Sequence, residues 1–340
     1  MDPVTQGLFG ALWAQAASRR SSVRAAALVG AAAGMAPDLD VLIRSPADDL
    51  VALEFHRHFT HAIVFVPIGA LVVALIAWPL LKRLHDPPSF ARAWTWALLG
   101  MASHGLLDAA TSYGTRLLWP MSDARLAANI ISVVDPFFTV PLALLLGLAL
   151  WRRRRRWAAV AAGWSALLLL FGTLQSWRAE RVVADWADAQ GLQPERVLAR
   201  PSLGNLWLWR GLVDTGESYR AVAVRILPGT PVRTWPGERV EALEPRDAPA
   251  GRIRRDLERF DDFSAGWLFR FAPYERGGEW FVGDFRYAID PASDRPLWGL
   301  RVDPDEPGRR AVFERPAEVR DDERAAFLAR LAGRDPGTDD

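Results

Sequence analysis

Four of the five histidines lie in two short motifs in the first third of the chain. The first is His56-Arg-His-Phe-Thr-His61, and the second is His104-Gly-Leu-Leu-Asp108. In a helix, residues four apart lie on one face, so His104 and Asp108 can hold a metal ion between them. Because an ionisable pair within an apolar segment is costly to bury, this pair indicates a functional site. The alternative is a hydrogen-bonded pair without a ligand.

More carboxylates lie near these motifs, in Pro37-Asp-Leu-Asp40 and in Asp135-Pro136. The chain contains no cysteine, which excludes disulfides and thiolate metal sites. Oxygen and imidazole donors favour Zn²⁺ first, with Mn²⁺ or Fe²⁺ as alternatives. Asp38, Asp40 or Asp135 is a candidate general base if it is not a metal ligand, and Arg57 is a candidate for binding an anionic substrate group.

Apolar segments contain or adjoin the motifs. Residues 62–81 are twenty residues without a charge, and a helix of that length spans about 30 Å, the thickness of a bilayer core. The composition predicts an α-helical membrane bundle of about six helices over residues 1–177, and the alternative is a buried bundle in a soluble protein. The other predicted helices cover 4–18, 23–43, 93–110, 130–151 and 157–174.

The loops between these helices differ in charge. The loops 19–24, 82–92 and 152–156 carry 11 basic residues, whereas 44–61 and 111–129 carry 4. The positive-inside rule puts the first set in the cytoplasm. The predicted protein is therefore a multi-pass protein of the bacterial inner membrane, with the motifs and everything after residue 177 on the periplasmic side.

The second part of the chain is highly charged and contains no histidine. Alternating apolar residues and turn signals predict an extramembrane α+β domain with an antiparallel sheet over 178–333, followed by a disordered tail over 334–340. A net charge of +1 without a basic face excludes nucleic acid as a partner. Predicted strands cover 205–212, 219–227, 267–272, 279–288 and 296–302, and predicted helices cover 252–262 and 321–332.

Taken in order, the motifs of residues 1–175 resemble those of the bacterial inner-membrane metal-dependent hydrolases of the YdjM-like family, and two motifs of the second domain resemble them more loosely. The HxxxD element also resembles a metal subsite of the zinc-dependent phospholipase C and single-strand nuclease superfamily. The resemblance implies that Asp38 or Asp40, His61 or His56, His104 and Asp108 are metal ligands. The motifs of the first region are Asp2-Pro-Val-Thr5, Gly7, Gly10-Ala11, Pro37-Asp38-Leu-Asp40, His56-Arg57-x-Phe59-Thr60-His61, Ser103-His104-x-x-x-Asp108, Thr111-x-Tyr113-Gly114-Thr115 and Asp135-Pro136.

One position departs from the family pattern. The residue after Thr5 is usually histidine in the family, and here it is Gln6. An amide is a poor zinc ligand, so we expect one or two metal ions and not three.

Two functions remain open on the sequence. The first is a metal-dependent hydrolase with its site at the outer membrane–water interface, surrounded by membrane lipids and acting on a phosphoester, a lipid or another cell-envelope molecule. The second is a noncatalytic membrane scaffold or regulator whose outer domain binds a protein partner. Retention of every candidate ligand except the one at position 6 favours the enzyme.

Overall fold

The computed structural model describes residues 1–316 and 320–337. The chain divides into two compact units that interleave in sequence. Unit 1 contains Met1–Ile43, Phe55–Thr173 and Leu203–Asn205. Unit 2 contains Arg44–Glu54, Leu174–Ser202 and Leu206–Asp340.

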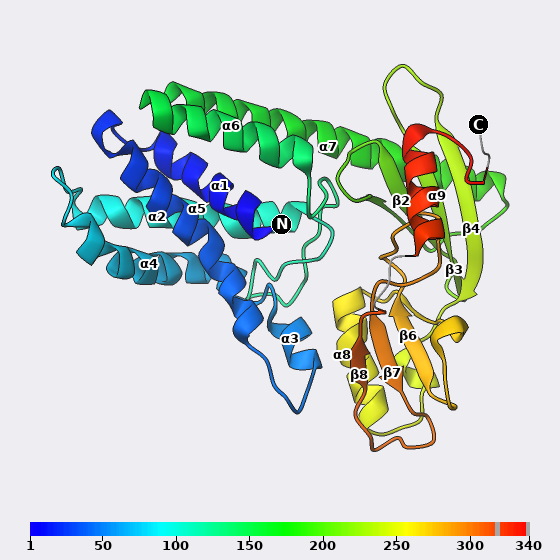
Figure 1. The fold of residues 1–340 in the computed structure, drawn as a ribbon. Coiled ribbons are helices and arrows are strands. Elements are labelled where there is room, and N and C mark those ends of the chain that lie inside the picture. The colour runs from blue at the N-terminus through cyan, green and yellow to red at the C-terminus, as the bar shows by residue number, and fades with distance from the viewer. Residues whose placement is uncertain (317–319, 338–340) are drawn as a thin grey trace. The chain divides into compact units, whose positions relative to one another are not determined.

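Unit 1 consists of helices, and neighbouring helices in it pack along one another (Figure 1). Helix α1 contacts α2, α5 and α6, and α4 packs against α5. The last helix, α7, continues into unit 2. The helices of this part of the chain are α1 (Pro3–Ala16), η1 (Arg20–Ser22), α2 (Val23–Met35), η2 (Ala36–Leu42), α3 (Leu50–Phe55), η3 (Phe59–His61), η4 (Ile63–Phe65), α4 (Val66–Leu81), α5 (Phe90–Ala110), α6 (Pro136–Arg152) and α7 (Arg156–Ala189).

Capping residues determine where two of these helices begin. The Asp2 side chain accepts a hydrogen bond from the backbone N–H of Thr5 at 3.0 Å, so it caps α1. Asp135 caps α6 in the same way, and proline follows each cap in the first turn, where its missing N–H costs nothing. The predicted helix over 130–151 was wrong at its start, because residues 130–135 are not helical and α6 begins at Pro136.

The helical character of the N-terminal region is confirmed, but six membrane-spanning helices are not established. Among the described residues, three segments are long and apolar enough to cross a membrane. α6 is apolar but has only 17 residues, and α1 has 14. The three segments are Arg20–Leu42, Ile63–Leu81 and Arg156–Ala189.

Glycine allows α1 and α2 to approach closely. A Cβ atom at Gly30 would lie 2.5 Å from the carbonyl oxygen of Gly10, and one at Gly34 would lie 2.5 Å from that of Gln6. Gly30 and Gly34 form the small-xxx-small pattern that brings membrane helices together. This contact places the start of α1 against the end of α2, beside the aspartates of η2.

Unit 2 contains two four-stranded antiparallel sheets, in the order β1-β2-β3-β4 and β5-β6-β7-β8 (Figure 1). The predicted C-terminal domain with antiparallel strands is confirmed, but it has two sheets where one was predicted. Strands β1, β4 and β8 were not predicted. The elements are β1 (Arg196–Pro201), β2 (Leu208–Asp214), β3 (Ser218–Arg225), β4 (Arg233–Glu241), η5 (Pro245–Asp247), α8 (Arg252–Ser264), β5 (Leu268–Arg270), η6 (Ala272–Tyr274), β6 (Trp280–Asp284), β7 (Gly299–Val302), β8 (Val312–Glu314) and α9 (Asp321–Ala332).

Aromatic side chains form much of the core of unit 2, where Trp267, Phe269 and Phe285 are at most 1 % exposed. Of the predicted tail, residues 338–340 lie outside the described residues. The described part includes Asp335, whose carboxylate accepts a hydrogen bond from Trp235 Nε1 at 2.6 Å. Disorder of the tail stays a prediction.

The connector Arg44–Glu54, between η2 and η3, belongs to unit 2 and forms ion pairs with α8. Arg259 Nη1 donates to Asp48 Oδ2 at 3.0 Å, and its Nη2 donates to Glu54 Oε2 at 2.9 Å. Arg252 Nη2 also donates to Asp48 Oδ2, at 3.3 Å. The hydrogen bond to Glu54 raises the pKa of Arg259 further above its usual range, so this tie persists at any physiological pH.

Candidate metal centre

Three elements of unit 1 bring two histidines and two aspartates together. Asp38 lies in η2, His61 ends η3, and His104 and Asp108 lie one turn apart on α5. One nitrogen or oxygen atom of each residue lies within 4.8 Å of the corresponding atoms of the other three. These four residues, the metal group, could hold a metal ion.

The contacts within the group all involve the Nε2 atoms of the histidines. These two atoms are 2.8 Å apart. Asp108 Oδ2 lies 3.3 Å from His61 Nε2 and 3.6 Å from His104 Nε2. Asp38 Oδ1 lies 3.6 and 3.5 Å from the same two nitrogens. Donors about 2.0–2.2 Å from a shared tetrahedral ion are about 3.3–3.6 Å apart, so four of the five separations fit such an ion directly.

The backbone of α2 fixes the orientation of His104. Its Nδ1 lies 2.6 Å from the carbonyl oxygen of Gly34, which only accepts hydrogen bonds. Nδ1 therefore carries a hydrogen, and in the neutral ring Nε2 has a free lone pair. Because His104 is fully buried, no water competes for this arrangement.

A hydroxyl and a carboxylate fix the orientation of His61. Thr60 Oγ1 donates its hydrogen to Asp40 Oδ2 at 3.1 Å. In the contact at 2.9 Å, Thr60 Oγ1 must therefore accept a hydrogen bond that His61 Nδ1 donates. The result is a relay from His61 through Thr60 to Asp40, of the kind that orients histidine ligands in metalloproteins.

Both Nε2 lone pairs are thus directed into the group. Two lone pairs on nitrogens 2.8 Å apart repel each other unless a cation lies beside them. Either a proton or a metal ion can serve, and the two adjacent carboxylates favour the greater charge of a metal ion. A donor set of two imidazoles and two carboxylates suits Zn²⁺, and also Mn²⁺ or Fe²⁺.

Asp108 has a separate set of contacts on each carboxylate oxygen. Oδ1 accepts a hydrogen bond from Gln6 Nε2 at 2.7 Å and also contacts the amino group of Met1. Oδ2 lies 3.0 Å from Arg57 Nε but has no hydrogen-bond partner among the described residues. Since Asp108 is fully buried, Oδ2 is available to a ligand inside the group.

Four of the predicted site residues lie outside the four-residue group. Asp40 accepts hydrogen bonds from His56 Nδ1 at 2.9 Å and from the backbone N–H of Arg57 at 2.8 Å, and so it holds the segment that carries His61. The side chain of Arg57 is buried, and its Nη1 donates to Thr111 Oγ1 at 2.9 Å. Asp135 Oδ1 accepts from two backbone N–H groups at the start of α6.

The residues that orient the two histidines were not among the predicted site residues. One of them is Thr60, which adjoins His61. Its hydroxyl, next to a histidine of the motif, could have indicated a residue that orients His61. The contact of His104 with the Gly34 carbonyl could not be predicted, because every residue type has a backbone carbonyl. Gln6, chosen for its departure from the family pattern, does contact the group through Asp108.

Comparison with known proteins shows which family the chain belongs to. The family described as YdjM inner membrane protein matches residues 1–179, just over half of the chain. The chain belongs to this family. All four residues of the metal group lie within the part shared with the YdjM family, and family membership together with the apolar helices supports a location in the inner membrane.

Several relatives of this YdjM-family chain match part of it. It is 29% identical over 120 residues to the uncharacterized protein YfhP of Bacillus subtilis, covering 35% of each chain. It is 32% identical over 144 residues to the inner membrane protein YbcI of Escherichia coli, covering 35% of this chain and 80% of YbcI. A biotin transporter of Salmonella typhimurium is 25% identical over 135 residues, which cover 39% of this chain and 42% of the transporter. No solved structure matches the chain.

Proposed function

We propose that this chain is a membrane-bound, metal-dependent hydrolase whose metal ion is held by Asp38, His61, His104 and Asp108. The observation that carries the proposal is the pair of histidines with their Nδ1 hydrogens committed elsewhere and their Nε2 atoms facing each other at 2.8 Å. Such an arrangement requires a cation, and two carboxylates lie beside it. Asp40, Thr60 and Gly34 maintain the orientation of both rings.

A divalent ion bound there supplies a Lewis acid and lowers the pKa of a coordinated water toward neutrality. The residues of the chain provide the remaining functions. Asp38 is the one member of the group whose side chain is partly exposed, at 16 %, so we expect substrate to approach from its side. Its Oδ2 is buried and has no hydrogen-bond partner among the described residues, so either carboxylate oxygen of Asp38 can serve as the ligand atom. The Asp40 carboxylate is occupied by Thr60, His56 and Arg57.

Arg57 acts on the site through Asp108. Its Nε lies 3.0 Å from Asp108 Oδ2, and a cation so close stabilises the ionised carboxylate that a metal ligand requires. A phosphoester in a lipid or another cell-envelope molecule suits the proposed location.

The full bundle of six membrane helices and its orientation belong to the same proposal. The three arginine-rich loops define the cytoplasmic side, so the metal group and the C-terminal domain face the periplasm. A reporter active only in the periplasm, fused after Gly191, should be active, and the same reporter fused at Arg154 should be inactive. The reverse pattern would contradict the orientation.

The metal centre is tested on the full chain purified in detergent. We expect about one tightly bound metal ion per chain in wild type and little in His104→Ala or Asp108→Ala. His85→Ala is the matched control, because His85 is an exposed histidine in the loop between α4 and α5 and should leave metal content unchanged. Unchanged metal in both site variants would refute the centre.

Hydrolysis is tested separately with the metal-loaded chain and phospholipid or phosphomonoester substrates. The proposal requires turnover that depends on the metal and is lost in Asp38→Asn. Metal binding without turnover of any of these substrates would contradict the hydrolase and favour the noncatalytic scaffold.

A further inference from the structure

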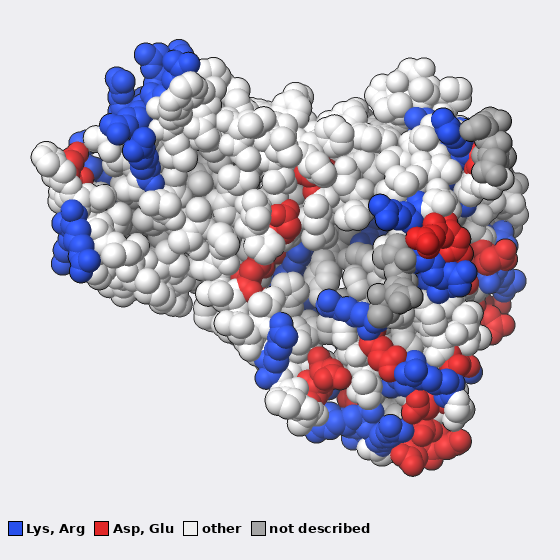
Figure 2. Space-filling model, viewed as in Figure 1, with Lys and Arg blue, Asp and Glu red and all other residues white. Residues whose placement is uncertain are grey.

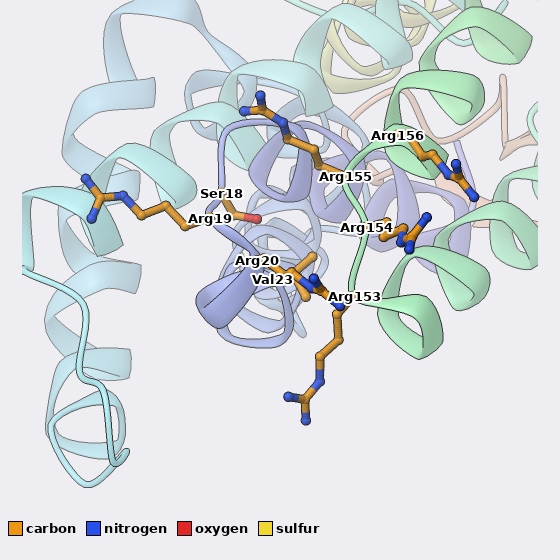
Figure 3. A pocket seen from close by; sticks show the side chains of 8 residues that line it. All are labelled: Ser18, Arg19, Arg20, Val23, Arg153, Arg154, Arg155 and Arg156. Atoms are coloured by element: carbon orange, nitrogen blue, oxygen red, sulfur yellow. The ribbon is translucent and has the colours of Figure 1, made fainter.

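Six arginines gather at the end of unit 1 opposite to the metal group. The metal group lies where α2 ends and where α1 begins, whereas the arginines lie where α1 ends and α2 begins, and where α6 gives way to α7. Figure 3 shows both loops together, with the guanidinium groups spread around the space between them. The residues that line the hollow are Ser18, Arg19, Arg20, Val23, Arg153, Arg154, Arg155 and Arg156.

This basic hollow has no internal counter-charge. Its lining contains no acidic residue, and among the described residues none of its six arginines forms an ion pair with a carboxylate. Figure 2 shows the same end of the unit densely covered by basic side chains. Like charges at this density repel one another, so an anion that bridges them stabilises the fold.

The size of the site indicates more than one phosphate group. The hollow has a volume of about 460 Å³. A second hollow adjoins it and is lined by Arg19, Arg20, Ser21 and Arg153, so three arginines border both. One guanidinium group can donate two parallel hydrogen bonds to the oxygens of a phosphate. Two adjoining hollows that share arginines therefore suit two linked phosphates.

The surface next to the hollow is apolar. On α6, Leu144 and Trp151 are 70 and 72 % exposed. On α7, Val160 and Leu167 are 50 and 60 % exposed. A ligand bound in the basic hollow would contact this apolar surface if it extended along α6 and α7. Acyl chains suit that surface, and phosphate groups suit the hollow.

We propose that the basic hollow binds the headgroup of an anionic diphosphate phospholipid, of the cardiolipin type, whose acyl chains lie along α6 and α7. The site is separate from the metal group and does not depend on the hydrolase activity. Basic pockets between membrane helices commonly bind such headgroups. The arginines then serve as a specific lipid site as well as a determinant of topology.

The test measures lipid binding to the full chain in neutral detergent by native mass spectrometry and by thermal shift. Arg20→Ala combined with Arg154→Ala should weaken cardiolipin binding at least tenfold. The matched control is Lys82→Ala with Arg83→Ala, which removes the same charge from a loop outside the hollow and should change binding less than twofold. Metal content and the unfolding temperature without lipid should stay at wild-type values in both variants, which shows that they are folded.

Two further ligands distinguish the source of the phosphates. Phosphatidylglycerol, with one phosphate, should bind at least tenfold more weakly than cardiolipin, and pyrophosphate should not displace cardiolipin. Equal weakening by the two double variants would mean that only the total charge matters, and would overturn the site. Displacement by pyrophosphate at a similar concentration would overturn the lipid as its ligand.

Discussion

Replacing Thr60 with valine tests whether the orientation of His61 is set by the relay to Asp40. Valine has nearly the same shape as threonine but neither donates nor accepts a hydrogen bond, so His61 Nδ1 loses its partner at 2.9 Å and Asp40 Oδ2 loses one at 3.1 Å. The free imidazole can then rotate or change tautomer. Either change removes the Nε2 lone pair from the metal group.

The size of the effect follows from the bonds that are lost. A hydrogen bond to a charged group contributes about 1.5–3 kcal/mol, and a neutral one contributes about 0.5–1.5 kcal/mol. Loss of a residue that orients a metal ligand weakens metal binding by about tenfold to hundredfold. Because Asp40 Oδ2 lies 3.3 Å from His61 Nδ1 and can partly replace the hydroxyl, we expect the lower end for Thr60→Val, about tenfold.

The assay is a competition titration of Zn²⁺ between the purified chain and a chromophoric chelator. Thr60→Ser retains the hydroxyl and should bind within threefold of wild type. Thr95→Val removes a hydroxyl that bonds only the backbone of its own helix, to Ala91 at 2.8 Å, and serves as the control for such a substitution elsewhere. Wild-type affinity in Thr60→Val would refute the relay.

Three other changes test the site and its supports. Gln6→His should raise the metal content or affinity, because imidazole is a better zinc donor than an amide; elemental analysis with equal values for wild type and variant would remove position 6 from the site. Gly34→Ala should lower the free energy of unfolding by about 1–3 kcal/mol in a denaturation assay, since its Cβ would lie 2.5 Å from the Gln6 carbonyl oxygen. Gly147→Ala is the control and should not be destabilising, because an added Cβ there would have no atom of the described residues within 4 Å. Metal affinity should fall as the pH is lowered, because protons compete with the metal ion for its imidazole and carboxylate ligands. An affinity that does not change with pH would argue against these ligands.

The predicted site contained all four members of the metal group, but the sequence could not show which residue of each neighbouring pair belongs to it. Asp38 and Asp40 are two residues apart in a 3₁₀ helix, where each residue advances about 120° around the axis, so they face different directions. Asp38 joins the group and Asp40 supports His61. Arg57 has a left-handed backbone, with φ of 59°, so regular spacing between His56 and His61 could not be assumed.

The fold was predicted best where local sequence determines it. The limits of α9 agree with the predicted 321–332, and α8 differs from its prediction by two residues at the end. Strand β4 was not predicted, because it carries Pro236, Gly237 and several charges, and its pairing comes from β3 rather than from its own apolar pattern. Strand β1 was missed for a related reason, since arginines occupy two of its six positions.

The ion pairs of the connector at residues 44–54 can form only late in synthesis. Asp48 and Glu54 find their arginines on α8, more than 200 residues later in the chain. Until the ribosome has made α8, the connector between Asp40 and His56 carries two carboxylates whose ion-pair partners do not yet exist. No single cut separates the two units, so a fragment that ends at residue 177 retains all four proposed metal ligands but lacks the α8 partners of this connector.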